Sequence, residues 1–92
     1  MLVIPWEHRT SFFDITRQEL RSLYRLTDLA WMLAQQKDET VTGFNIGINE
    51  GKAAGQTIEH CHIHLIPRRT GDTEDPTGGV RNVIPGRGKY CE

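Results

Sequence analysis

Histidine occupies three alternate positions of one short segment, at His60, His62 and His64, with apolar residues between them. In a β-strand, side chains at alternate positions share a face, so the three imidazoles would lie together while the intervening residues face a core. Pro67 has no amide hydrogen to give to a sheet and is expected to end the strand. We therefore predict a strand over residues 60–67 that carries chemistry on one face.

Three kinds of chemistry fit such a histidine face. Imidazoles two positions apart, roughly 6.5–7 Å along a strand, can converge on one zinc ion. However, Cys61 and Glu59 would face the other way, so no catalytic metal and no cofactor is expected. Histidines held by hydrogen bonds in a core are the ordinary alternative for one residue, yet three in register are costly to bury in a small domain. The third kind is covalent phosphate chemistry, in which a neutral imidazole attacks phosphorus and a neighbouring one balances the phosphate charge.

A loop of small residues precedes the histidines and favours the phosphate chemistry. Residues 50–59 include two glycines and two alanines, a composition that can present backbone amides to phosphate oxygens, although most such loops only connect strands. The strand expected over residues 42–49 has glycines on its polar face, which leaves room for a ligand. Arg68 and Arg69 are candidates to bind a substrate anion, with solvated surface charge as the alternative.

One long amphipathic helix is expected before the strand at 42–49. Thr16 and Glu19 match a capping box, so the helix should begin near Thr16, and the polar residues from Gln35 onward should end it. Its apolar residues at three- and four-residue spacing are Leu20, Leu23, Tyr24, Ala30, Trp31 and Ala34. Four further apolar residues widen this stripe, which predicts a homodimer contact, with simple exposure as the equal alternative. They are Leu26, Leu29, Met32 and Leu33.

Length and composition indicate one small domain. The 92 residues carry 11 Lys and Arg against 12 Asp and Glu, and this balance argues against binding nucleic acid through bulk charge. No apolar run is long enough for a membrane span, no signal peptide is recognisable, and Cys61 and Cys91 lack metal or redox spacing, so a cytoplasmic location is expected. Residues 2–5 predict a short strand, residues 1–68 the folded core, and the Gly- and Pro-rich residues 69–92 an extended tail.

The stretch from residue 55 to residue 68 resembles the signature of the histidine triad (HIT) superfamily, in which His-x-His-x-His is followed by apolar residues and preceded by a Gly-Gln-Ser/Thr loop. The likeness extends upstream through residues 44–51 and more loosely to residues 2–5. Segments similar to the diadenosine polyphosphate hydrolases and phosphorylases are Gly71-Asp72-Thr73, Gly78-Gly79 and Val83-Ile84-Pro85. The resemblance implies an α+β fold, an antiparallel sheet with one long helix, here a partial HIT-like fold.

The resemblance also implies a nucleotide hydrolase or transferase. It would cleave at the α-phosphate of a dinucleoside polyphosphate or nucleoside phosphoramidate, through a nucleotidyl-histidine intermediate and without a metal. By position, His62 would be the nucleophile, His64 would contact the α-phosphate, and His60 would support the site by hydrogen bonding. The residues do not choose between hydrolysis and phosphorolysis, nor do they identify the base or the leaving group.

The residues ahead of the histidines receive roles from the same resemblance. Thr57 corresponds to the hydroxyl residue near the leaving group. Gly55 and Gln56 correspond to the phosphate loop. Asn49 corresponds to a polar residue that contacts the phosphate or the ribose.

Members of the family form homodimers through the long helix and a sheet edge, and they carry a β-hairpin ahead of the strand that residues 2–5 resemble. That hairpin lines the base and ribose pocket, so the match here covers the phosphate-reacting half of the site. An unpaired edge at residues 2–4 would be prone to aggregation, which predicts an obligate homodimer, with strand exchange as one arrangement. A nucleotide-binding or catalytically inactive remnant is the alternative function.

Overall fold

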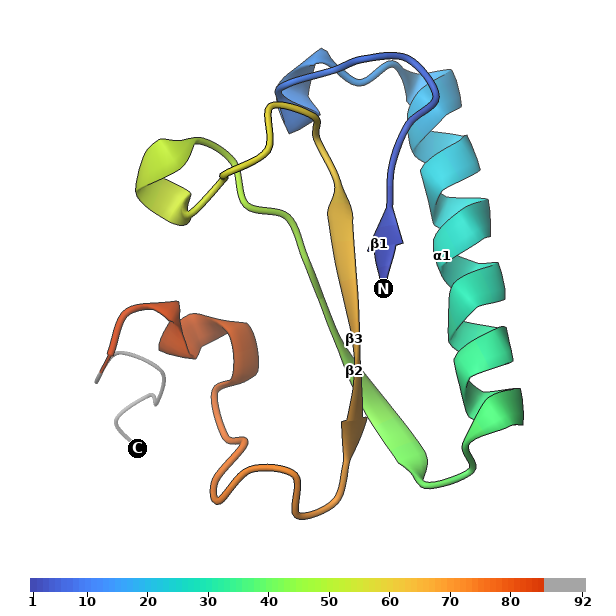
Figure 1. Cartoon of the computed structure of the whole chain (residues 1–92), viewed down its shortest axis with the longest axis vertical. Helices are drawn as coiled ribbons and strands as arrows, with labels where there is room; N and C mark the ends of the chain where they lie inside the picture. Colours follow the sequence, from blue (N-terminus) through green and yellow to red (C-terminus); the bar gives the residue numbers. More distant parts are fainter. Residues whose placement is uncertain (86–92) are drawn as a thin grey trace.

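Residues 1–85, which a computed structural model describes, form an α+β fold in which a three-stranded antiparallel sheet packs against one long helix (Figure 1). The helix and strands are β1 (Leu2–Val3), α1 (Arg17–Lys37), β2 (Val41–Gly47) and β3 (Ile63–Arg69). Three short 3-10 helices are η1 (Phe12–Asp14), η2 (Lys52–Ala54) and η3 (Gly79–Val83). The strand order is β1-β3-β2, so the strand that carries His64 is central. The fold class expected from the sequence is confirmed.

Helix α1 begins where the capping box predicts. The hydroxyl of the N-cap residue Thr16 accepts a hydrogen bond from the Glu19 amide (3.1 Å), and the Glu19 carboxylate accepts one from the Thr16 amide (2.9 Å). The same carboxylate pairs with the Arg9 guanidinium at 3.2 Å. The Arg9 carbonyl in turn accepts a hydrogen bond from the Cys61 amide. The first turn of α1 is therefore linked to the segment that holds the histidines.

The helix is longer than the sequence pattern suggests, and it buries a narrower face. It continues past Gln35 to Lys37, because glutamine and lysine are good helix formers. The line that packs on the sheet is Leu23, Thr27, Ala30 and Ala34, of which the first and last are buried. Leu20, Tyr24 and Trp31 were expected in the buried stripe but stay exposed, Tyr24 at 73%. Trp31 is only partly covered, by Phe44 of β2, whose ring centroid lies 6.4 Å away.

The hydrophobic core lies between α1 and the central strand. Its buried cluster and the partly buried residues that pack on it are Val3, Leu23, Ile63, Ile15 and Ile48. Leu65 is fully buried. Within β3, Ile63 and Leu65 therefore face the core as predicted, and Cys61, which precedes the strand, is buried as well.

Strand β3 has different ends from those predicted. It begins at Ile63, so residues 60–62 precede it, and it runs through Pro67 to Arg69. The Leu65 amide donates toward β1, to the Met1 carbonyl at 2.9 Å, and the nitrogen of Pro67 faces the same side of the strand. Because β1 pairs only with His64 and Ile63, the described residues offer no acceptor at that point, and the missing amide hydrogen of proline costs nothing there.

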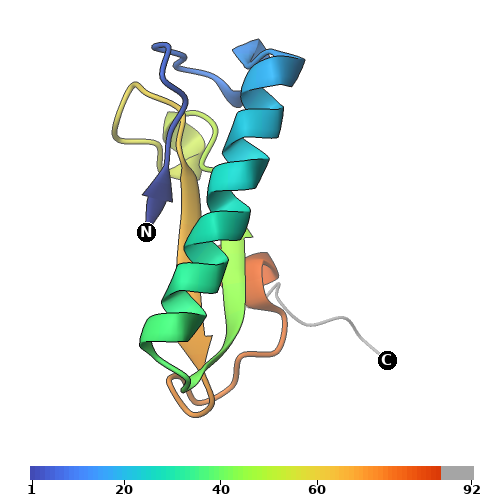
Figure 2. The same ribbon diagram turned by 90° about the vertical axis from the view of Figure 1, so that its right-hand side faces the viewer.

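Helix α1 covers one face of the sheet, and η3 lies on the opposite side, next to β2 (Figures 1 and 2). Strand β2 spans Val41–Gly47, two residues short of the predicted end, and it pairs antiparallel with β3 so that Gly47 faces His64. The chain after β3 was expected to be extended. Within the described residues it instead forms a turn and then η3 at Gly79–Val83, while residues 86–92 of the expected tail lie outside the described part.

Candidate active site

His62 is the buried member of the histidine segment, with 8% of its surface exposed. Its Nδ1 lies 2.8 Å from the backbone carbonyl oxygen of His60. A carbonyl oxygen only accepts, so Nδ1 must carry the proton and donate it. In a neutral ring the other nitrogen, Nε2, then has a free lone pair. The backbone thus selects the tautomer in which Nε2 is the nucleophilic atom.

The ring of His64 packs edge-on against that of His62, with centroids 4.7 Å apart and planes at 73°. His64 lies on β3 opposite Gly47, whose lack of a side chain leaves this part of the sheet open. The Nε2 atom of His64 is buried and has no hydrogen-bond partner among the described residues. Buried polar atoms are ordinarily paired, so His64 keeps a hydrogen-bonding capacity that the fold itself does not use.

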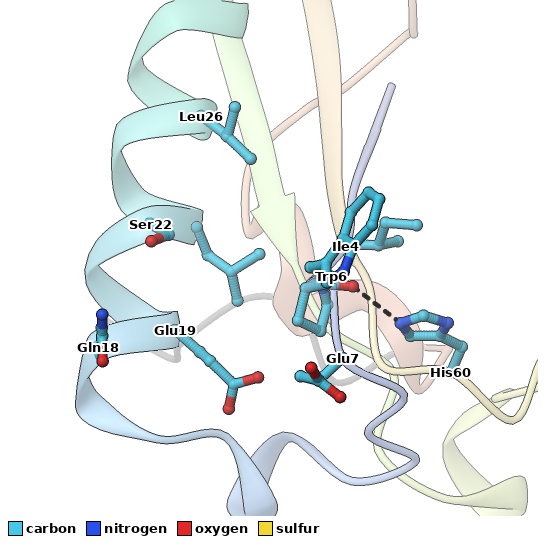
Figure 3. Close-up of a pocket in the computed structure, with 10 residues that line it drawn as sticks. Ile4, Trp6, Glu7, Gln18, Glu19, Ser22, Leu26 and His60 are labelled. Carbon is cyan, nitrogen blue, oxygen red and sulfur yellow. Dashed lines mark hydrogen bonds between the residues drawn. The ribbon is translucent and has the colours of Figure 1, made fainter.

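His60 does not share a face with the other two histidines, contrary to the prediction. Its Nε2 donates to the Pro5 carbonyl at 3.1 Å (Figure 3). Its ring packs edge-on against that of His8, with centroids 5.1 Å apart. The reason is that residues 60–62 precede β3, so strict alternation does not apply to them. The chain therefore forms two ring pairs, His62 with His64 and His60 with His8. His8 is exposed, and no sequence signal placed it against His60.

The loop between β2 and β3 is closed by the side chain of Gln56. The Gln56 Oε1 accepts from the Gly51 amide (2.8 Å), while Nε2 donates to the carbonyls of Thr10 (2.9 Å) and Ile58 (3.1 Å). Backbone amides at residues 54, 55 and 56 also donate to carbonyls within the loop. These amides are therefore not free to form the expected phosphate nest. Gln56 instead ties the loop to the segment ahead of α1.

The other predicted loop residues lie at the surface. Thr57 and Gly55 are exposed, and Gly55 has the left-handed backbone conformation that ends η2 (φ 91°). Asn49 is exposed beside this glycine, since a Cβ at Gly55 would lie 3.7 Å from Asn49 Nδ2. Asn49 and His64 also border one depression on the sheet. The structure therefore brings Asn49 and Gly55 together, and Asn49 near His64.

The two arginines considered for anion binding are held by carboxylates. Arg68 forms two 2.8 Å hydrogen bonds with Asp72, and Arg69 approaches Asp38 at 2.8 Å. Hydrogen bonds from Arg68 lower the pKa of the Asp72 carboxyl. Hydrogen bonds to Asp38, the strongest from the Thr40 hydroxyl and the next from Arg69, lower the pKa of its carboxyl to about 2. Both arginines are therefore surface charges that form ion pairs.

Cys61, next to the histidines, is a buried free thiol. Burial raises the pKa of this thiol above its ordinary value, and the negative charge of the Glu50 carboxylate raises it further. The protonated thiol is a poor nucleophile, so Cys61 is not a candidate nucleophile of this site. Within residues 1–85 no group of three or more His, Cys, Asp or Glu side chains is arranged to hold a metal ion, and no helix there is long and apolar enough to cross a membrane.

Curated proteins are similar to this chain in sequence. A bis(5'-adenosyl)-triphosphatase from Dictyostelium discoideum is 41% identical over 81 residues, which cover 82% of this chain and 50% of that protein. An AP-4-A phosphorylase from Mycobacterium tuberculosis is 34% identical over 88 residues, covering 92% of this chain and 44% of that protein. The chain thus spans at most about half the length of these curated relatives.

A solved structure supports the same relationship. Diadenosine triphosphate hydrolase from Plasmodium falciparum, crystallised with cyclomarin A, superimposes with a TM-score of 0.71 at 31% identity, covering 80% of this chain and 50% of that one. The family model described as the HIT domain matches residues 1–71, which include the sheet, the helix and all four histidines. This chain belongs to the HIT domain family.

Proposed function

We propose that this protein is a nucleotide hydrolase or transferase that cleaves at an α-phosphate through a nucleotidyl-His62 intermediate. The observation that carries the proposal is the hydrogen bond from His62 Nδ1 to the His60 carbonyl, which leaves Nε2 as the free nitrogen beside His64. The names of its relatives support the substrate class, since they are a bis(5'-adenosyl)-triphosphatase and an AP-4-A phosphorylase. Because the chain spans only part of those proteins, its activity is a proposal.

In the first step, His62 Nε2 attacks the α-phosphorus, and the bond to the leaving group breaks. The ring becomes N-phosphorylated and cationic, and its Nδ1 proton stays in the hydrogen bond to the His60 carbonyl, which stabilises the positive ring. In the second step, the oxygen of water or of another acceptor attacks the same phosphorus and gives its proton to the departed leaving group or to solvent. The P–N bond breaks, and its electron pair returns to Nε2. The tautomer held by the backbone is thus suited to both steps.

His64 and the loop residues have supporting roles in this proposal. A proton on His64 Nε2, the buried atom without a partner, would donate to a phosphate oxygen as negative charge develops there. Thr57 is assigned to the leaving-group side and Asn49 to the phosphate or ribose. For Gly55 and Gln56 we propose an indirect role, in which Gly55 leaves space beside Asn49 and Gln56 holds the loop in place.

Intact-mass measurement tests this proposal. Rapidly quenched protein incubated with a dinucleoside polyphosphate should show the mass of one added nucleoside monophosphate, and the His62→Asn variant should not. His8→Asn serves as the matched control, because His8 is exposed and its ring contact is with His60. Binding of nucleotide with neither adduct nor product release would instead support the alternative, a nucleotide-binding or inactive remnant.

We also propose a cytoplasmic homodimer. Support comes from an apolar groove of about 360 Å³ between β1 and the outer side of α1, lined by Met1, Leu2, Val3, Ile4, Leu26, Leu29, Ala30 and Leu33. A second copy would cover this groove, and exchange of β1 would pair its free edge. Light scattering should give the mass of two chains, and Leu29→Glu should shift the protein toward one. A monomer at micromolar concentration would contradict the homodimer.

A further inference from the structure

A depression of about 250 Å³ lies on the face of the sheet that α1 does not cover, beside His64. It is lined by Asn45, Ile46, Gly47, Asn49, His64, Ile66, Val80 and Val83. The lining combines His64 and Asn49, which have roles in the proposed chemistry, with the aliphatic residues Ile66, Val80 and Val83. These aliphatic residues form a wall of the depression and have no role in that chemistry.

The wall formed by η3 is fixed to the sheet. Gly79 packs so closely on β2 that a Cβ there would lie 3.3 Å from the Asn45 side-chain nitrogen. The Asn45 side-chain oxygen accepts a hydrogen bond from Arg68, and Arg68 is itself held by two hydrogen bonds to Asp72. The sheet, the turn after it and η3 therefore form one connected unit, and the valines of η3 have a defined place beside the site.

The valines of η3 are exposed although they border a concave site. Val80 is 55% exposed and Val83 is 81% exposed. Ligand pockets are usually lined by apolar side chains with a few polar groups among them. Such a lining suits an aromatic ring, whose flat faces are apolar. The depression is smaller than the ~300–1,000 Å³ of typical drug-sized pockets, so it suits a single ring system.

We infer that Val80 and Val83 are specificity-determining residues that receive the nucleobase of the leaving nucleotide. The depression is lined by His64 and not by His62, so a group bound in it contacts the second imidazole of the pair and not the nucleophile. In an in-line displacement the leaving group departs on the side opposite the attacking atom. The substrate class is then a dinucleoside polyphosphate, in which both ends carry a base. This inference rests on the proposed function.

Two substrates that differ in the leaving group test the inference. A dinucleoside polyphosphate has a base in its leaving group, whereas adenosine 5'-phosphoramidate releases ammonia. The double variant Val80→Ser/Val83→Ser should raise KM for the dinucleoside roughly five- to tenfold, through lost apolar contact, and leave kcat/KM for the phosphoramidate within about twofold. Val80→Ile/Val83→Ile, which keeps the wall apolar, should behave like the unchanged protein on both substrates.

The outcomes separate the inference from the proposed function. Equal losses on both substrates would overturn the inference, because they would mean that η3 only supports the fold, and so would no change on either. If the unchanged protein turns over neither substrate, the proposed function fails. The inference is then decided by calorimetry, where tighter binding of the dinucleoside than of nucleoside monophosphate should be lost in the serine double variant. An unchanged binding preference would overturn it.

Discussion

The two histidine pairs have nearly the same ring geometry and yet differ in what they can do. The centroids of His62 and His64 lie 4.7 Å apart, and those of His60 and His8 lie 5.1 Å apart, both edge-on. His62 donates from Nδ1 to a carbonyl, while His60 donates from Nε2. The first pair is largely enclosed, and the second lies toward solvent with His8 exposed. The difference teaches that the ring contact does not distinguish the two pairs, whereas the ring nitrogen that the backbone holds, and the burial of the ring, do.

The largest expected effect comes from His62→Asn. The asparagine has no nitrogen lone pair to attack phosphorus, so kcat/KM on a dinucleoside polyphosphate should fall at least about a thousandfold. Steady-state product release by chromatography measures this loss. A residual rate within about tenfold of the unchanged protein would abolish the distinction between the two pairs.

Replacing His64 should separate activity from stability. His64→Leu removes the buried nitrogen that has no partner, so the free energy of unfolding should rise by up to about 1 kcal/mol. The same change should lower kcat about 10²-fold, because a donor to the phosphate is lost. Urea unfolding and turnover are measured on the same preparation. A variant that loses stability would show that His64 is bonded in solution and not waiting for a ligand.

Replacing His60 should change the free energy of unfolding in the direction opposite to that expected for His64→Leu. His60→Leu loses the hydrogen bond to the Pro5 carbonyl and should lower the free energy of unfolding by about 1 kcal/mol. Turnover should fall less than about tenfold, because the backbone carbonyl that orients His62 remains. Urea unfolding and kcat are the measurements. A loss as large as that of His62→Asn would mean that the His60 ring itself takes part in the chemistry.

The smallest effect is expected for His8→Asn. His8 is exposed, and among the described residues its ring contacts that of His60. We therefore expect little change in kcat and a change of about 0.5 kcal/mol or less in the free energy of unfolding. Thermal unfolding together with turnover checks this. If His8→Asn proves as damaging as His60→Leu, the outer pair is a functional unit.

The sequence was most informative where a local hydrogen-bond pattern decides the structure. The start of α1 followed from Thr16 and Glu19, because a capping box is contained within four consecutive residues. The passage of β3 through Pro67 could not be foreseen, since it depends on how short β1 is. In both cases, the separation along the chain of the interacting residues decided whether the structure could be predicted from the sequence.

The same distinction holds for the candidate site. The spacing of the histidines marked the reacting segment, but the separation of His60 from His62 and His64 depends on where β3 begins. The bonds of Gln56 to Thr10 and Gly51 needed the loop to be built before they could be recognised. The contact of η3 with Asn45 is likewise long-range along the chain, and the pair Gly78-Gly79 alone did not predict it.

One carboxylate, that of Glu19, takes part both in the cap of α1 and in the ion pair with Arg9. The Arg9 carbonyl in turn binds the amide of Cys61, the residue immediately before His62. A single substitution at Glu19 would therefore weaken the start of the helix and loosen the segment that carries His62, although Glu19 itself is 43 positions away from it along the chain.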